Sequence, residues 1–373
     1  MSPSPGRIIF ANQLRGVCVL CVMLVHYTVV VQAMRGDVAW VVAAPPLDTP
    51  VPAIASWANP AWLDLGKFGV GAFFLISGFV VPFSLQSAGA ARFMLARALR
   101  IYPTFWLALL AQGSAIAASS SYWGITAPYG LRDYAINGLL VGTLLDRQTV
   151  DWVSWTLSVE VKFYLAMALL RPLVLRRRAW PLLSLAAGGT ALNALHAAGW
   201  APLPPHLVSE ATYLGFILIG TLFHYHYRGA LSSARLALAG AAMLGLFYAS
   251  YRLGPTRSDV SLHPLSFAFA LAAFALAYAL RARFRANRAL DFLAAISYPL
   301  YLVHAASGFA AISFLMMAWR MPYAPAAAIS AAAAIGVAWL LHVVVELPTM
   351  RLGQRLAARR RPWAAEPRVA GGG

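Results

Sequence analysis

The stretch NQLRGVCVLCVMLVHYTVVVQAM, residues 12–34, decides the class of this protein. A helix needs roughly 20 predominantly apolar residues to cross the hydrocarbon core of a bilayer, and this run has that length. Two ionisable side chains, Arg15 and His26, are embedded in it. A cleaved signal peptide is the alternative, because Val31-Gln32-Ala33 resembles a cleavage site. We favour a retained transmembrane helix, since His26 interrupts the apolar core and further apolar runs follow.

Runs of similar length recur along the chain, and together with 12–34 they make ten. Hydrophobic residues make up 61% of the 373 residues and charged residues only 11%, whereas a soluble domain carries roughly a quarter charged residues. We therefore expect an all-α, polytopic, multi-pass protein of the inner (cytoplasmic) membrane, with the lipid bilayer as its solvent. The nine further predicted spans are 67–86, 101–119, 153–175, 180–198, 207–227, 232–251, 262–280, 290–316 and 323–346.

The distribution of basic residues predicts the topology, because cytoplasmic loops of membrane proteins carry an excess of Lys and Arg. With the N-terminus inside, the predicted cytoplasmic segments hold 21 of the 29 basic residues, and the outer segments hold 7. An eleventh run, 131–145, is shorter and has charges at both flanks. If it crossed, the clusters 176–178 and 281–288 would lie outside. We therefore expect about ten spans and both termini in the cytoplasm.

The formal net charge is +17, which in a soluble protein would suggest a nucleic-acid partner. The positive-inside distribution accounts for the charge here, so we expect no nucleic acid among the partners. We divide the chain into a transmembrane domain, 1–350, and a basic cytoplasmic tail, 351–373. The arginines of the tail are typical of a segment that lies on the inner leaflet.

Ionisable residues within the spans are the candidate functional groups, because each one is costly in lipid unless it is paired or faces a cavity. Arg15 and His26 are 11 residues apart, which is about three helical turns and roughly 16 Å, so they share one face of the first span. Histidine is well suited to take a proton from a hydroxyl near neutral pH. The alternative is an arginine that reaches the interface and a histidine that bonds a neighbouring helix.

Arg97 and Arg100 share a helical face at the cytoplasmic start of the third span. Backbone N–H groups at a helix N-terminus and two guanidinium groups together suit a phosphate. We therefore predict a phosphate site here, and ordinary positive-inside anchoring is the alternative reading.

Glu160 and His304 are further ionisable residues at depth, and both could line a cavity with His26. Glu160 follows the Trp-rich stretch WVSW (152–155), and tryptophan rings suit stacking on a sugar. We take Glu160 as a carboxylate partner of His26, with Trp155 and His304 as substrate-binding residues.

Other polar or small residues receive structural interpretations. The stretch HYHY (224–227) is typical of an interfacial belt, and a metal site there would need a third ligand that the sequence does not offer. We expect no metal. We interpret Cys18 and Cys21 as packing residues, and the glycines of the second span as permitting close helix contacts.

Five stretches follow one another in order over about residues 10–350 and carry a family resemblance. They are QLRG to His26 (13–26), GVGAFFLISGF (69–79), RALRIYP (97–103), WTLSVEVKFY (155–164), and SYPLYLVH (297–304) with ELP (346–348). Together they resemble the acyltransferase 3 family of membrane-bound acyltransferases. Two departures are Val161-Lys162 after Glu160, where the family often has Glu-Gln, and Gly71 or Ala72 at a position that is often acidic.

The resemblance implies O-acyl transfer, with acetyl-CoA or another acyl-CoA as co-substrate and a hydroxyl of a carbohydrate-type acceptor, such as a cell-envelope glycan, as the second substrate. His26 would be the base or would carry the acyl group, while Glu160 would orient His26 or the acceptor. Arg97 and Arg100, with help from Arg15, would bind the CoA phosphates. The alternative from another class is a proton-coupled transporter or flippase in which His26, Glu160 and His304 relay protons.

Overall fold

The computed structural model describes residues 8–48, 60, 62–87, 89–147, 149–255 and 263–358, and within these ranges the chain forms helices and no strand. Most predicted spans form one long helix, and others are broken by a bend or a π-helical turn. The elements of the first half are α1 (Ile9–Val25), η1 (His26–Val30), α2 (Val31–Ala33), α3 (Arg35–Val41), α5 (Leu65–Ser87), α6 (Ala90–Trp123), α7 (Leu131–Gly138), η2 (Gly142–Leu145), α8 (Trp155–Leu169) and α9 (Arg171–Leu175).

The second half has the same character, and its last long helix continues through a π-helical turn. Its elements are α10 (Trp180–Ala197), α11 (Pro205–Tyr227), α12 (Ser233–Leu253), α13 (His263–Ala279), η4 (Arg281–Arg283), α14 (Arg288–Val303), α15 (Ala305–Met317), α16 (Tyr323–Leu341), η5 (His342–Glu346) and α17 (Leu347–Ala358). The predicted tail is therefore helical up to residue 358, and residues 359–373 lie outside the described part of the chain.

The all-helical prediction is confirmed, and so is the presence of long apolar helices. Within the described ranges, 6 helices are long and apolar enough to cross a membrane, or 7 if α14 and α15, which bend by 73°, count as one span. The remaining predicted spans correspond to α8, α10 and α13, which are shorter or more polar. Ten crossings and the orientation of the termini therefore remain predictions.

The rejected eleventh run does not form one long helix. Residues 131–145 form α7, which has 8 residues, and the short 3₁₀ helix η2. At 1.5 Å per residue α7 is about 12 Å long, well below the roughly 30 Å of a hydrocarbon core.

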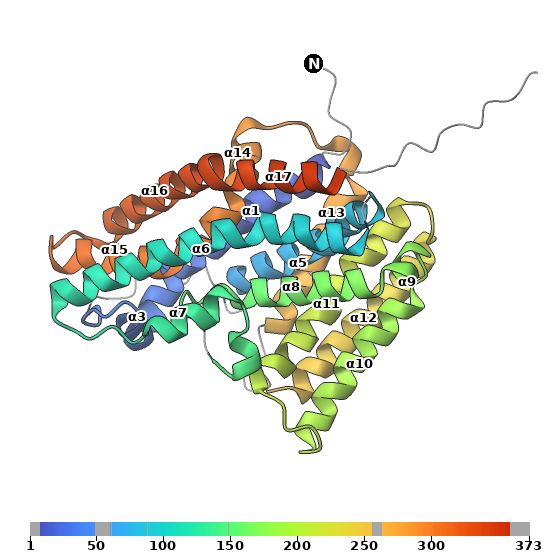
Figure 1. Ribbon diagram of the computed structural model, residues 1–373, viewed down its shortest axis with the longest axis horizontal. Coiled ribbons are helices and arrows are strands. Elements are labelled where there is room, and N and C mark those ends of the chain that lie inside the picture. The colour runs from blue at the N-terminus through green and yellow to red at the C-terminus, as the bar shows by residue number, and fades with distance from the viewer. Residues whose placement is uncertain are drawn as a thin grey trace, which may run out of the picture.

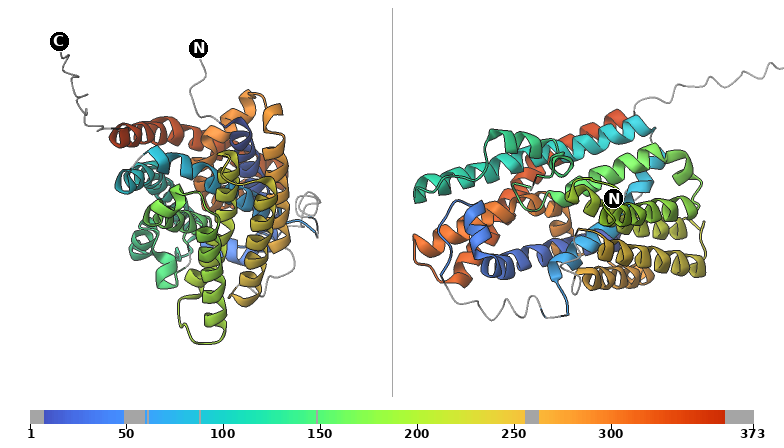
Figure 2. Two further views of the ribbon diagram at one scale, coloured as in Figure 1. Left: turned by 90° about the vertical axis from the view of Figure 1, so that its right-hand side faces the viewer. Right: turned by 90° about the horizontal axis from the view of Figure 1, so that it is seen from below.

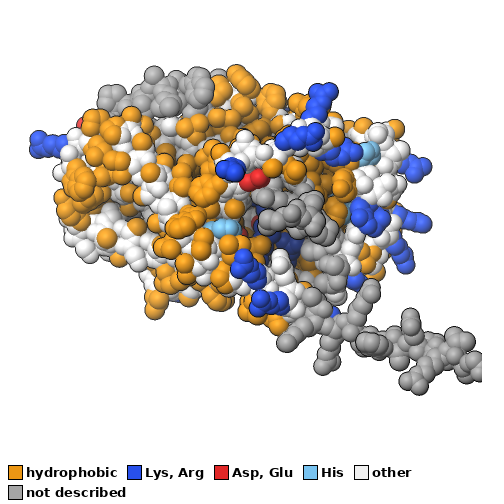
Figure 3. Space-filling model, turned by 90° about the horizontal axis from the view of Figure 1, so that it is seen from above, with side chains coloured by type: hydrophobic (Ala, Val, Ile, Leu, Met, Phe, Trp, Pro, Cys, Tyr) orange, Lys and Arg blue, Asp and Glu red, His pale blue; other side chains and the backbone are white. Residues whose placement is uncertain are grey.

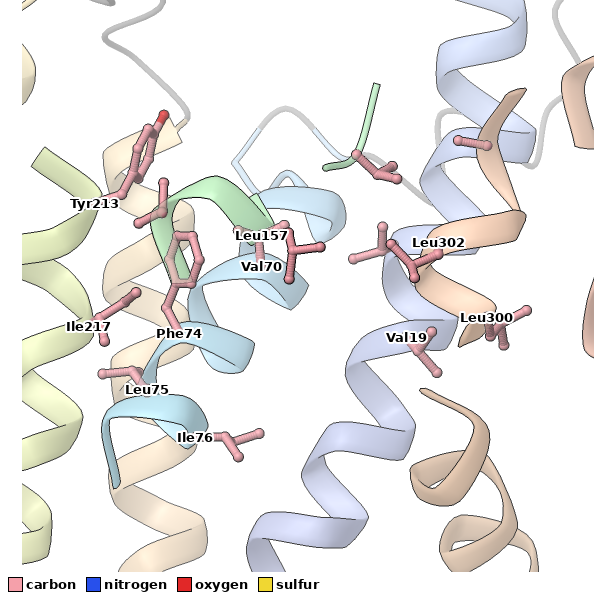
Figure 4. Close-up of a cluster of buried hydrophobic side chains, with 14 of the residues drawn as sticks. Val19, Val70, Phe74, Leu75, Ile76, Leu157, Tyr213, Ile217, Leu300 and Leu302 are labelled. Carbon is pink, nitrogen blue, oxygen red and sulfur yellow. The ribbon is translucent and has the colours of Figure 1, made fainter. Parts of the chain in front are cut away.

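Four helices form the centre of the molecule, with α1 between α5 and α14, and α11 on the other side of α5. Val19, Phe74, Leu157 and Leu302 come from four different helices and converge in one apolar cluster (Figure 4). The helices α6, α15, α16 and α17 lie on one side of this centre, and α10 and α12 lie on the other (Figure 1). Figure 2 shows the helices α10 to α13 running side by side.

Glycine allows the closest of these helix contacts. A Cβ atom on Gly78 of α5 would collide with the backbone oxygen of Ile217 in α11, and one on Gly220 would collide with that of Leu75. Small residues let helix backbones approach in membranes, as we predicted for the second span.

The surface carries large apolar areas and a basic end. Figure 3 shows hydrophobic side chains over most of one face, with Lys and Arg side chains gathered mainly toward one end. Exposed apolar patches of this extent are typical of a lipid-facing protein. The beginning of α6, the helix α9 and the end of α17, all predicted to be cytoplasmic, share one side of the molecule (Figure 1).

Candidate active site

His26 and His304 each lie where a helix departs from regular α geometry. His26 is the first residue of the π-helical turn η1, and π turns inside α-helices are frequent at functional sites. His304 lies at the 73° bend between α14 and α15 and is fully buried. The packing of α1 against α14 brings the two side chains together.

The two imidazoles form a hydrogen-bonded pair. His26 Nδ1 lies 2.8 Å from His304 Nε2, and the rings stack at 4.8 Å between centroids with an interplanar angle of 17°. His304 Nδ1 lies 3.0 Å from the backbone oxygen of Leu300, which only accepts hydrogen bonds. His304 Nδ1 therefore carries a proton, and in the neutral ring Nε2 accepts from His26 Nδ1–H. This assignment leaves His26 Nε2 with a free lone pair.

A second bond ties the first span to the same bend. The hydroxyl of Tyr27 donates to the backbone oxygen of His304 at 2.8 Å. A Cβ atom on Gly308 would collide with the Tyr27 hydroxyl, so glycine in α15 leaves room for this contact. The position of His304 is thus fixed by both residues 26 and 27.

A cavity lies on the predicted cytoplasmic side of the histidine pair, toward Arg15 on the first helix. Its polar groups are two arginines, one carboxylate and several hydroxyls, and its wall includes Val70, Phe74, Leu157 and Leu302 of the apolar cluster in Figure 4. The ring of Tyr301 lines it and lies 5.9 Å from the ring of His304, so the cavity and the pair adjoin. The lining residues are Arg15, Val70, Phe73, Phe74, Ser77, Arg100, Thr156, Leu157, Glu160, Ser297, Tyr298, Tyr301 and Leu302.

Glu160 belongs to this cavity and does not pair with His26. Its carboxylate accepts hydrogen bonds from the Ser77 hydroxyl at 2.9 Å and from the Tyr164 hydroxyl. It also lies close enough to Arg15 and Arg100 for its charge to interact with theirs. The predicted carboxylate–histidine pair is therefore wrong, because α8 faces α5 and α6 at this level, while α1 presents His26 to α14.

Arg97 and Arg100 differ in their surroundings. Arg100 lines the cavity, whereas Arg97 is 9% exposed, lies over the rings of Phe93 and Tyr164, and donates to Ser84. The helix α6 begins at Ala90, about two turns before Arg97. The expectation that the N–H groups of a helix N-terminus stand beside these arginines is therefore wrong.

The structure places the two predicted substrate-binding residues, His304 and Trp155, at different sites. His304 is the partner of His26, as described above. Trp155 lines a groove on the other side of the histidines, together with Trp40 and Trp152. Lys67 lies 5.6 Å above the Trp155 ring.

One hydrogen-bonded histidine–carboxylate pair and one ion pair were missed by the sequence analysis. His342 and Glu346, both in η5, are 2.6 Å apart, and Glu346 is an electrostatic neighbour of Arg100. Their i, i+4 spacing was a usable signal. Lys162 is 2.7 Å from Glu210 of α11, and two residues so far apart in sequence gave no such signal.

The HYHY stretch is only partly interfacial. His224 is fully buried between α5 and α11, where it contacts the Gln86 amide at 2.9 Å and the backbone oxygen of Phe79 at 3.1 Å. In the described part of the chain, no group of three or more His, Cys, Asp or Glu residues is arranged to hold a metal.

The fold and this site together indicate an integral membrane protein with a buried histidine pair beside an arginine-lined cavity. Residues 8–343 match the family model described as an acyltransferase domain, Acyl_transf_3. The chain therefore belongs to the acyltransferase 3 family, as its motifs suggested, and is an acyltransferase rather than a transporter.

Two curated proteins are similar to it. The acyltransferase MdmB of Streptomyces mycarofaciens is 29% identical over 353 residues, covering 81% of this chain and 84% of that protein. Nodulation protein 10 of Rhizobium leguminosarum bv. viciae is 32% identical over 125 residues, covering 27% of this chain and 32% of that protein. No solved structure gives a significant match.

Proposed function

We propose that this protein transfers an acyl group, acetyl in the simplest case, from acyl-CoA to a hydroxyl of a carbohydrate-type acceptor at the inner membrane. The observation that carries the proposal is the hydrogen-bonded chain from Leu300 through His304 to His26. It fixes the tautomer of His26 and leaves Nε2 of this half-buried side chain as a proton acceptor. This is what general-base activation of a hydroxyl requires.

The reaction follows from that arrangement. The acceptor hydroxyl gives its proton to His26 Nε2 while its oxygen attacks the thioester carbonyl carbon. The C–S bond then breaks, and the CoA sulfur leaves with the proton that His26 held. His304 stabilises the imidazolium through its Nε2 lone pair, a task that an acidic residue performs in hydrolytic triads.

We assign the donor site to Arg15 and Arg100, with Arg97 behind them. Guanidinium groups bind phosphate oxygens through paired hydrogen bonds. Arg15 lies 11 residues before His26, or roughly 16 Å along the helix, a length comparable to the pantetheine arm. Phosphates held at the arginines would thus place the thioester close to His26.

Glu160 takes a positioning role in this scheme in place of the predicted contact with His26. Its carboxylate is held by Ser77 and Tyr164 and lies among Arg15 and Arg100. It offsets part of the positive charge of the cavity and reduces the mutual repulsion of the two guanidinium groups before the donor binds.

The test uses purified protein in lipid nanodiscs, together with cells that lack the gene. His26→Ala should abolish acylation of envelope glycans, followed by mass spectrometry, while acyl-CoA binding measured by calorimetry persists. Near-wild-type acylation by this variant would show that the base is another residue. Absence of acyl-CoA binding by the wild-type protein would refute acyl-CoA as the acyl donor.

A further inference from the structure

A groove lined by three tryptophans lies on the side of the histidine pair opposite the arginine-lined cavity. Trp40 of α3 and Trp152 and Trp155 at the start of α8 line it together with Asp37, Arg147 and His206. We propose that this groove binds the acceptor as a neutral, hydroxyl-rich sugar ring stacked on the indoles. The inference rests on the proposed function and assigns the acceptor side of the same site.

The backbone around Trp152 is built to present its ring. Trp152 has φ +62°, a conformation that is an outlier for a bulky side chain and that costs free energy. The fully buried Asp151 holds the turn by accepting from the backbone N–H groups of Val153 at 3.2 Å and Ser154 at 2.9 Å. Such strain persists only where the surroundings enforce it, and here the result is the direction of one indole.

One aromatic ring, that of Phe309, connects the groove to the base. The ring of Phe309 lies 6.0 Å from that of Trp152 and 6.0 Å from that of His26. Trp155 lines the groove, and the next residue, Thr156, lines the arginine-lined cavity. An acceptor in the groove and a donor at the arginines would therefore approach His26 from opposite sides.

The charge of the groove points to a neutral ligand. The formal charges at the groove balance: the carboxylates of Asp37 and Asp146, the latter 3.8 Å from His206, stand against the guanidinium of Arg147 and the ammonium of Lys67, which lies 5.6 Å over the Trp155 ring. The other cavity, in contrast, has two arginines against Glu160. Indole faces with a few hydrogen-bonding groups at the rim suit a ring that is apolar on its faces and carries hydroxyls at its edges.

The experiment compares Trp152→Gly, Trp155→Ala and the control Trp200→Ala, whose side chain is 80% exposed and does not line the groove. Glycine adopts φ +62° without strain, so Trp152→Gly removes the ring while leaving the turn intact. Each variant is expressed in cells that lack the gene, and the acylated products are identified by mass spectrometry. Acyl-CoA binding to each purified variant is measured by calorimetry.

We expect both groove variants to lower acylation about tenfold or more, the equivalent of about 1.4 kcal/mol, while acyl-CoA binding matches that of Trp200→Ala. The acylated product should carry the group on a neutral sugar. Unchanged acylation by both variants would overturn the groove as the acceptor site, and a product acylated on an anionic sugar or on no sugar would overturn the ligand class. Failure of the proposed function is distinct, because the wild-type protein would then neither bind acyl-CoA nor restore acylation.

Discussion

His304 Nε2 accepts a hydrogen bond from His26 Nδ1 at 2.8 Å, so the tautomer of one histidine is set by the other. This relationship predicts different effects for two substitutions of His304. Alanine removes the acceptor and should lower kcat by about 10²-fold or more, the scale of general-base catalysis. Glutamine can offer an amide oxygen to His26 Nδ1–H and should restore part of the rate.

Steady-state kinetics with radiolabelled acyl-CoA would measure the effect, and KM for acyl-CoA should stay unchanged in both variants. Equal rates for the alanine and glutamine variants would show that His304 acts by packing alone.

A second prediction separates Arg100 from Arg97. Arg100→Ala should weaken CoA binding by about 1.5–3 kcal/mol, the contribution of a hydrogen bond to a charged group. Arg97→Ala should lower the thermal stability more and the affinity less, because its guanidinium stacks on Phe93 and Tyr164. Calorimetric titration with CoA would measure the affinities, with the exposed Arg288→Ala as control. A larger loss of CoA affinity in Arg97→Ala than in Arg100→Ala would instead place the phosphate at Arg97.

A third prediction concerns the charge of the arginine-lined cavity. Glu160→Gln should raise the affinity for CoA several-fold, because it removes a carboxylate that repels the phosphates, and about 1 kcal/mol is a fivefold change. The amide retains contacts with Ser77 and Tyr164, so the thermal stability should change little. Weaker CoA binding in this variant would contradict the proposed role of Glu160.

The fourth prediction tests the contact between α5 and α11. Gly78→Ala should destabilise the fold by about 1–3 kcal/mol or more, because the added methyl group collides with the backbone of α11. Gly240→Ala in α12 is the matched control, since a Cβ there meets nothing within 4 Å. Thermal unfolding in detergent would compare the midpoint temperatures of the two variants. Equal midpoints would show that α5 and α11 can move apart without a loss of stability.

The topology gives a fifth prediction. In a background without Cys18 and Cys21, a cysteine at position 177 should react with a membrane-impermeant maleimide only after the membrane is opened. A cysteine at position 147 should react in intact spheroplasts. The reason is the excess of basic residues in the segments predicted to be inside. Outside labelling at position 177 would overturn the ten-span topology.

Sequence alone located most of the helices, because hydrophobic run length is a local property. It also identified His26, His304 and Glu160, since ionisable residues at depth are costly wherever they lie. It did not reveal their partners. The depth of a residue in the membrane does not reveal which helices are neighbours. Glu160 was therefore assigned to His26, whereas α14 packs against α1 there.

The sequence analysis also failed to predict several local details of the backbone. The predicted helix start near Arg97 was wrong because Arg92, Arg97 and Arg100 interrupt the apolar run, although residues 90–100 already belong to the same helix. The π turn at His26 and the positive φ of Trp152 were likewise not predicted from the sequence.

The bond between residues 26 and 304 also bears on how the protein is made. These residues are 278 positions apart, so His304 is synthesised long after His26, and the helices α15 to α17 follow it. A nascent or truncated chain contains His26 and the arginines of the donor cavity but lacks the group that sets the tautomer of His26. Under the proposed function, thioester chemistry therefore awaits the synthesis of His304, and products that terminate before it would not consume acyl donor.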